Sequence, residues 1–154
     1  MRAYFITVCT KDRRPFLWDG RATARLLGSS YLLSEATAFV PPLLVMGKAV
    51  SAAIAQIPSI YGDVTAEPFG IMPDHFHMIL NIFPDENGLP QPAPSVSRVV
   101  EQLKRAISLR IGQSIWQRSY YEHIVRNELD YQEIRKYIEE NPIRWILKRQ
   151  VNRA

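Results

Sequence analysis

The 154-residue sequence contains only one cysteine and no long uninterrupted apolar run. Because Cys9 lacks a partner within the chain, a small scaffold held together by disulfides is excluded, and a reducing cytoplasm is the expected environment. The longest apolar stretch, residues 39–57, is interrupted by two prolines, a glycine and a lysine, so it falls short of the roughly 20 residues that cross a membrane. The first residues show no secretory signal pattern, and we expect neither export nor a membrane anchor.

Charge of neither sign dominates the composition, but the small excess is positive. Charged residues make up 22% and hydrophobic residues 47% of the chain, which excludes a disordered chain and predicts one globular domain over residues 1–154. The net charge of +4 favours a polyanionic partner without requiring one. Basic residues concentrate in the second half of the chain, at Arg98, Lys104, Arg105, Arg110, Arg118, Arg126, Arg135, Lys136, Arg144, Lys148 and Arg149.

A pair of adjacent strands is the clearest local structure that the sequence predicts. Residues 66–72 and 75–83 are apolar runs that flank a short Pro-Asp turn, the pattern of an antiparallel hairpin. Residues 3–10 are rich in β-branched and aromatic side chains and predict a first strand, followed by an exposed basic turn. The Ala-rich residues 48–57 predict a helix that ends before Pro58.

A proline-rich loop and a helix are predicted to follow the hairpin. Residues 84–95 contain four prolines and predict an exposed loop that ends at Ser95, the N-cap of a helix stopped by Gly112. The apolar stripe of this helix is expected to leave three basic residues off the buried face: Arg98, Lys104 and Arg105.

The last part of the chain predicts one strand and one helix. Residues 114–126 are aromatic and β-branched and are expected to hold the strand, after which Asn127 caps a helix that Pro142 is expected to break. The order strand, helix, two strands, helix, strand, helix predicts an α+β domain with helices packed on an antiparallel sheet.

Two histidines in the second hairpin strand carry the strongest chemical signal. Side chains two residues apart in a strand point to one face, so His75 and His77 are expected to project together while Phe76 and Met78 enter the core. Two neutral imidazoles at this spacing can converge on one divalent ion. The alternative is a pair of solvated histidines, which is the commoner case for an arbitrary His-x-His sequence. Their position inside a strongly apolar strand favours a function.

The last helix offers a second candidate pair. Tyr137 and Asn141 lie one turn apart on the same helical face, where the tyrosine offers a phenol and the asparagine an amide oxygen. The alternative is that the tyrosine packs against the protein and the asparagine terminates the helix before Pro142.

Packing and nucleic-acid contact are both open for the remaining aromatic and basic residues. Trp116, Gln117 and Arg118 can contact bases or close the sheet, and of Tyr120 and Tyr121 we assign one to packing and one to DNA. The candidate DNA contacts are Arg13, Arg14, Lys104, Arg105, Trp116, Arg118 and Tyr121.

Three segments resemble the single-tyrosine HUH (IS200-like) transposases, most closely the REP-associated tyrosine transposases of bacteria. They are YFITVCTKDRRPFL, FGIMPDHFHMILNI and SIWQRSYYEHIVRNELDYQEIRKYIEENPIRW. The match covers about the first 17 residues and nearly everything from Phe69 to Trp145, with the motifs in the family's order.

The resemblance implies a ferredoxin-like α+β domain that nicks and rejoins single-stranded DNA. His75 and His77 would bind Mg²⁺ or Mn²⁺ with Asn141 as third ligand, and the Tyr137 hydroxyl would attack a phosphate to give a 5′-phosphotyrosine and a free 3′-OH. A protonated phenol is a poor nucleophile, but phenolate is a good leaving group, which suits reversible strand transfer. The expected partner is hairpin-flanked single-stranded DNA in the bacterial cytoplasm, and a monomer is favoured over a homodimer.

Two other function classes remain open. An inactive or domesticated DNA-binding module would keep the sheet and basic helices without chemistry, and it would be indifferent to a chelator. A metal-dependent hydrolase would activate water with the histidine pair and would require another acid or histidine close by. Asp74 is the nearby acid, and strand alternation predicts that it points to the face opposite His75.

Overall fold

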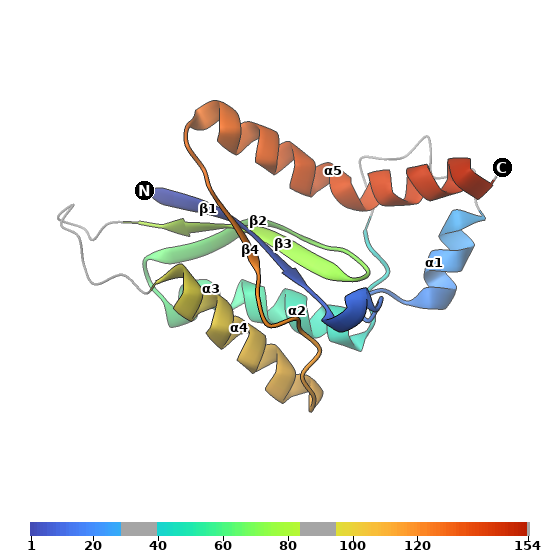
Figure 1. The fold of residues 1–154 in the computed structure, drawn as a ribbon, viewed down its shortest axis with the longest axis horizontal. Helices are drawn as coiled ribbons and strands as arrows, with labels where there is room; N and C mark the ends of the chain where they lie inside the picture. Colours follow the sequence, from blue (N-terminus) through green and yellow to red (C-terminus); the bar gives the residue numbers. More distant parts are fainter. Residues whose placement is uncertain (29–39, 84–94, 154) are drawn as a thin grey trace.

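A four-stranded antiparallel sheet forms the centre of the molecule. The computed structural model describes residues 1–28, 40–83 and 95–153, and everything said below of the structure concerns these residues. The strands are β1 (Arg2–Cys9), β2 (Val64–Ile71), β3 (His75–Ile82) and β4 (Tyr121–Ile124). Their order is β2-β3-β1-β4, and each neighbouring pair is antiparallel (Figure 1). The predicted α+β, ferredoxin-like class is confirmed.

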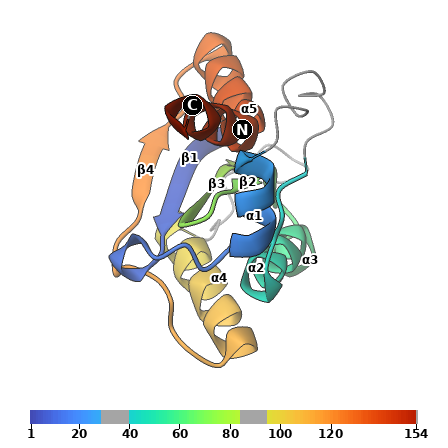
Figure 2. The same cartoon turned by 90° about the vertical axis from the view of Figure 1, so that its right-hand side faces the viewer.

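Helices cover both faces of the sheet. A short 3-10 turn (Lys11–Arg13) precedes α1 (Gly20–Leu27), α2 (Val45–Ala55), α3 (Ile57–Ile60), α4 (Val96–Ile111) and α5 (Glu128–Arg153). Figures 1 and 2 show α2, α3 and α4 on one side of the sheet and α5 on the other. Within the described ranges, no helix is both long and apolar enough to cross a bilayer.

Strand alternation gives the sheet two different faces. On the α2 and α4 side, β3 contributes the fully buried Phe76, Met78 and Leu80 to the large core. On the α5 side, Ile79 packs in a smaller cluster with Ile138 of α5. The histidines belong to this second, thinner layer, which leaves room for polar groups.

The predicted hairpin is confirmed. β2 and β3 pair in a register that places Gly70 opposite His77, and the ladder shifts between Ala66 and Phe69. On its other side β3 pairs with β1, where His77 faces Thr7 and His75 faces Cys9. His77 is thus held between two strands rather than at an edge.

The predicted helix boundaries are mostly confirmed. The Ser95 hydroxyl accepts from the Arg98 amide at the start of α4, and Gly112 ends that helix with a φ of 89°. The Asn127 side chain accepts from the Asp130 amide at the start of α5. The helix predicted over residues 48–57 is α2, which runs from Val45 to Ala55, and Ile57 and Pro58 begin the separate short helix α3. Of the loop predicted over residues 84–95, only Ser95 lies within the described residues.

The prediction that Pro142 breaks the last helix is wrong, because α5 continues through it to Arg153. An interior proline removes a hydrogen bond and costs about 3 kcal/mol or more. Burial of residues that follow Pro142 offsets this cost. Ile146 is fully buried, and the Trp145 ring packs against Trp18 with ring centroids 5.2 Å apart. Figure 1 shows α5 bending partway along its length, as expected for a helix that contains proline.

Candidate metal and tyrosine site

The two histidines project from the same face of β3, as the sequence predicts. Their ring centroids lie 5.3 Å apart, and the intervening Phe76 is fully buried on the opposite face. Both rings therefore lie on the side of the sheet that α5 covers.

His77 is buried, so a solvated histidine pair is excluded. Its side chain is only 1% exposed and contacts the rings of Phe5 and Tyr137, at centroid distances of 6.0 and 5.5 Å. Burial, with a smaller effect from the charge of His75, lowers the pKa of His77 from its ordinary value to about 3. The imidazole is therefore neutral at physiological pH, and no group in the described ranges forms a hydrogen bond with its buried Nε2. An unpartnered buried nitrogen of this kind is available as a ligand atom.

His75 is oriented by Asp74. The Nδ1 atom of His75 lies 2.8 Å from Oδ1 of Asp74, and Nε of Arg13 donates to the other carboxylate oxygen at 3.0 Å. Partial burial acts to raise the pKa of the Asp74 carboxyl, but hydrogen bonds from His75 and Arg13 outweigh it and hold the pKa below its ordinary value. Because a carboxylate only accepts, Nδ1 donates the hydrogen, which leaves Nε2 as the ligand atom of the neutral ring.

The prediction that Asp74 points away from His75 is wrong. Asp74 lies in the turn before β3, which begins at His75, so strand alternation does not govern it. A carboxylate behind a histidine is the usual outer partner of a metal-binding imidazole.

Replacing Asp74 with asparagine should lower the affinity for Mn²⁺ by about 10–100-fold, because the neutral amide no longer raises the basicity of the His75 ring. Isothermal titration of both proteins measures this. Asp63→Asn, at an exposed aspartate in the turn before β2, is the matched control and should change nothing. Equal affinities for Asp74→Asn and the parent protein would remove Asp74 from the site.

Tyr137 reaches the histidines from α5. It is 50% exposed, and its ring meets Phe5 edge-on with centroids 6.1 Å apart. The next residue, Ile138, is buried against the sheet and fixes the rotation of the helix, so the phenol lies beside His77 while open to solvent. Asn141 follows one turn later and is partly buried.

The described part of the chain holds no cluster of three His, Cys, Asp or Glu side chains that could bind a metal ion. Among these described residues, a third protein ligand beside the two histidines would come from another class of donor. The amide oxygen of Asn141 is a group of that class.

Two residues of the site were missed from the sequence. The Phe5 ring contacts His77, Tyr137 and Tyr121, and Gly70 lies directly across the ladder from His77. A Cβ on Gly70 would lie 3.0 Å from Nε2 of His77 and 3.2 Å from the Ile138 carbonyl oxygen. A glycine inside a strand was the available signal, since it marks a close approach of another group.

Gly70→Ala should therefore weaken metal binding and destabilise the protein by about 1–3 kcal/mol, because the methyl group crowds the His77 ring and α5. Denaturant unfolding and Mn²⁺ titration give the two effects. Gly62→Ala is the matched control, since a Cβ there meets nothing within 4 Å. Parent-like binding and stability in Gly70→Ala would mean that this space is not needed.

The predicted DNA contacts fall into two groups. Arg14, Arg105, Arg118 and Tyr121 are exposed, and Arg13 is exposed while bonded to Asp74 and to Sγ of Cys9. Trp116 is only 4% exposed and packs on Phe76, with ring centroids 5.3 Å apart. Its position is that of a core residue that closes the sheet.

The prediction that Lys104 lies off the buried stripe of its helix is wrong. Lys104 is only 7% exposed, and its ammonium donates to the carbonyls of Gln117 and Arg118 at 2.8 and 3.2 Å. These bonds hold the segment before β4 against α4, which is a structural role.

Exposed Arg105 and buried Lys104 should therefore behave differently. Arg105→Gln should weaken binding of single-stranded DNA and reduce the salt slope of log K by about one phosphate contact, or 0.7. Lys104→Met should instead lower stability by about 1–3 kcal/mol, because it leaves two carbonyls without their donor. Polarisation titrations at several salt concentrations and denaturant unfolding separate the two. An unchanged slope in Arg105→Gln would exclude a phosphate contact.

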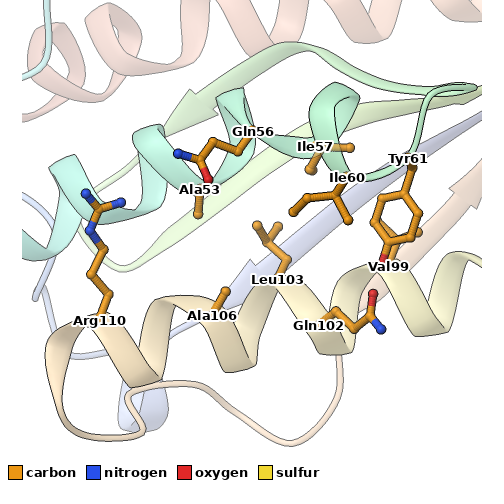
Figure 3. Close-up of a pocket in the computed structure, with 10 residues that line it drawn as sticks. All are labelled: Ala53, Gln56, Ile57, Ile60, Tyr61, Val99, Gln102, Leu103, Ala106 and Arg110. Carbon is orange, nitrogen blue, oxygen red and sulfur yellow. The ribbon is translucent and has the colours of Figure 1, made fainter.

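A largely apolar groove elsewhere on the molecule is not part of this site. It measures about 250 Å³ and lies between α2, α3 and α4, where Ile57, Leu103 and Arg110 contribute to its lining (Figure 3). These helices cover the sheet face opposite the histidines.

Sequence comparison finds a relative that matches most of this chain. No family model matches the chain. A Haemophilus influenzae protein described only as uncharacterized is 28% identical, with the match covering 92% of this chain and 81% of that protein.

Solved structures with a similar fold include two transposases. One is a REP-associated tyrosine transposase bound to a REP hairpin, with a TM-score of 0.59 and 22% identity over 93% of this chain and 67% of the other. The second is a putative transposase from Deinococcus radiodurans, with a TM-score of 0.51 and 19% identity over 90% of each chain. The protein described here has the α+β fold of these two transposase structures.

Proposed function

We propose that the protein is a metal-dependent transposase-type enzyme that nicks and rejoins single-stranded DNA through Tyr137. One observation carries the proposal: the solvent-open phenol of Tyr137 lies beside buried, neutral His77, with ring centroids 5.5 Å apart. If Tyr137 had only a packing role, an apolar side chain beneath its ring would serve as well. The buried imidazole of His77, whose Nε2 has no hydrogen-bond partner in the described residues, points to a function instead.

The donor set fits a divalent ion such as Mg²⁺ or Mn²⁺. His77 offers an unpartnered Nε2, His75 offers an Nε2 made available by Asp74, and Asn141 would supply an oxygen. When bound, the ion would neutralise charge that develops on the phosphate in the transition state. The histidines are thus ligands and not bases.

Tyr137 performs the covalent step. Its hydroxyl oxygen attacks the phosphorus of a phosphodiester, the new bond joins tyrosine to the 5′-phosphate, and the P–O3′ bond breaks. The phenol loses one proton and the departing 3′ oxygen gains one, so the step is balanced. The product keeps a high-energy aryl phosphate ester, which a 3′-OH of another strand can attack in the reverse sense.

The proposed partner is single-stranded DNA beside a hairpin. The net charge of +4 and the exposed Arg14, Arg105 and Arg118 suit a polyanion. The similar REP-associated tyrosine transposase structure was determined with a REP hairpin, which makes such a hairpin the first probe to use.

A DNA-binding module without chemistry is the second candidate. It is favoured by the lack, within the described ranges, of three clustered His, Cys, Asp or Glu ligands. Such a module would bind the same DNA equally well with and without a chelator.

The test uses hairpin oligonucleotides from the flanks of the gene, labelled at the 5′ or the 3′ end. With Mn²⁺, the 3′ label should become bound to denatured protein and the 5′ label should leave on a shorter strand, because tyrosine keeps the 5′-phosphate of the downstream fragment. EDTA should prevent both. If the protein bound several hairpins but gave neither the protein-linked label nor the shortened strand, with Mg²⁺ or with Mn²⁺, the result would support the DNA-binding module instead.

A further inference from the structure

A second, polar pocket lies on the same face of the sheet as the histidines. Its volume is about 440 Å³, within the roughly 300–1,000 Å³ of small-ligand sites. It is formed by the two hairpin strands and the first turns of α5, and the side chains that matter are Thr65, Glu67, Asn81, Tyr131 and Arg135.

The pocket is close to the proposed catalytic site but separate from it. Asn81 lies four residues after His77 on β3, about 13 Å farther along the strand. Arg135 precedes Tyr137 by two residues on α5. A ligand in the pocket would therefore lie beside the reacting phosphate and not on it.

Asn81 provides an unused acceptor. The side chain is only 5% exposed, and its Nδ2 donates to Oγ1 of Thr65 and to the main-chain oxygen of Glu67, both at 3.2 Å. Because a main-chain carbonyl only accepts, the amide is held in this orientation. Its Oδ1 is left buried with no donor in the described residues, a state that is costly unless something else supplies a donor.

The other lining residues suit a nucleotide. Tyr131 is a partly buried aromatic ring that can stack on a base, as in other single-strand binding sites. The guanidinium of Arg135 is half-exposed, and Glu139 orients it through a 3.0 Å contact. The acid Glu67 disfavours a free, doubly charged phosphate as the main ligand.

We infer that this pocket binds one base of the single strand, displaced from the cut site, and that the base donates an amino hydrogen to Oδ1 of Asn81. Arg135 contacts the phosphate that flanks this base. The assignment to DNA rests on the proposed function. It makes the pocket a specificity site that favours a base with an amino group, namely adenine, cytosine or guanine.

The first test needs no variant. Fluorescence polarisation in EDTA, which removes metal-dependent cleavage, compares oligodeoxyadenylate with the same strand carrying purine, which lacks the amino group, and with an abasic strand. Loss of one hydrogen bond should weaken binding about fivefold for purine. Loss of stacking should weaken it roughly tenfold or more for the abasic strand. Equal affinity for adenine and purine strands would overturn the inference.

Neighbouring cations of α5 give a matched pair of variants. Arg135 and Lys136 each carry one charge and each pair with a glutamate four residues on, but only Arg135 lines the pocket. Arg135→Gln should lower affinity and reduce the salt slope by about 0.7, whereas Lys136→Gln should do less. Equal losses of DNA affinity in the two variants would show that binding depends only on the net positive charge of α5, and would contradict a specific contact with Arg135.

A variant of Asn81 links the amino effect to the pocket. Asn81→Ala should bind adenine and purine strands alike, and retention of the parent preference in a folded Asn81→Ala protein would overturn the inference. The covalent assay reports separately on the proposed function. Tyrosine-linked product without any adenine preference would refute the pocket alone, and adenine preference without product would refute the chemistry alone.

Discussion

Tyr137→Phe should abolish the covalent protein–DNA product, with a loss of at least about a thousandfold, while binding of single-stranded DNA stays nearly unchanged. The substitution removes only the hydroxyl oxygen that would join to phosphorus. The ring, its edge-on contact with Phe5 and its place beside His77 are kept. Denaturing gels of labelled strands measure the product, and polarisation measures binding.

Tyr121→Phe is the matched control for this experiment. Tyr121 is 58% exposed and also meets the Phe5 ring, at a centroid distance of 6.2 Å, so it lies on the same face of the sheet. The variant should retain the covalent product. Product that persists in Tyr137→Phe and disappears in Tyr121→Phe would assign the nucleophile to β4 instead.

His77→Ala should eliminate both metal binding and strand cleavage, because it removes the buried ligand nitrogen. At an Mn²⁺ concentration about 100 times the dissociation constant, the parent protein should gain about 2.7 kcal/mol, which raises its melting temperature by roughly 5–10 °C. The variant should show no such rise. Differential scanning calorimetry with and without Mn²⁺ reads this effect independently of activity.

His123→Ala controls for nonspecific metal effects. Its Nε2 lies 2.9 Å from Oδ2 of Asp130, so the ring links β4 to the start of α5 and is already occupied. This variant should lose some stability and keep the full Mn²⁺ response. If Mn²⁺ still raised the melting temperature of His77→Ala but not that of His123→Ala, the metal would bind at His123 and not at His77.

The parts of the fold that depend on local sequence were predictable. The alternation of β3 placed His75 and His77 on one face, and the Pro-Asp turn placed β2 beside them. The caps at Ser95 and Asn127 were predictable for the same reason, because a side chain that bonds an amide three residues away is a local interaction.

The failures at Pro142 and Lys104 involve contacts between distant segments. Pro142 is tolerated because residues beyond it pack near α1 and Trp18, and Lys104 is buried because the segment before β4 supplies two carbonyls. Asp74 lies outside the strand that was used to orient it. Neither hydrophobic periodicity nor secondary-structure propensity predicts such contacts, since tertiary packing overrides both.

The candidate site was predictable only in part for the same reason. Residue spacing predicted that His75 and His77 share one face of a strand and that Tyr137 and Asn141 share one face of a helix. No local sequence pattern predicted that α5 packs over β3. That step came from the resemblance to the transposases, and the structure brings the Tyr137 and His77 rings together. The contribution of Gly70 became visible only with the two segments in contact.

Peptide mapping of the trapped product tests the central claim most directly. The protein would be incubated with Mn²⁺ and a cleavable hairpin strand, digested with protease and nuclease, and analysed by tandem mass spectrometry. The account predicts a nucleotide 5′-phosphate on Tyr137, within the α5 peptide that contains Ile138. A nucleotide on any other residue, or none although the strand is cut, would contradict it.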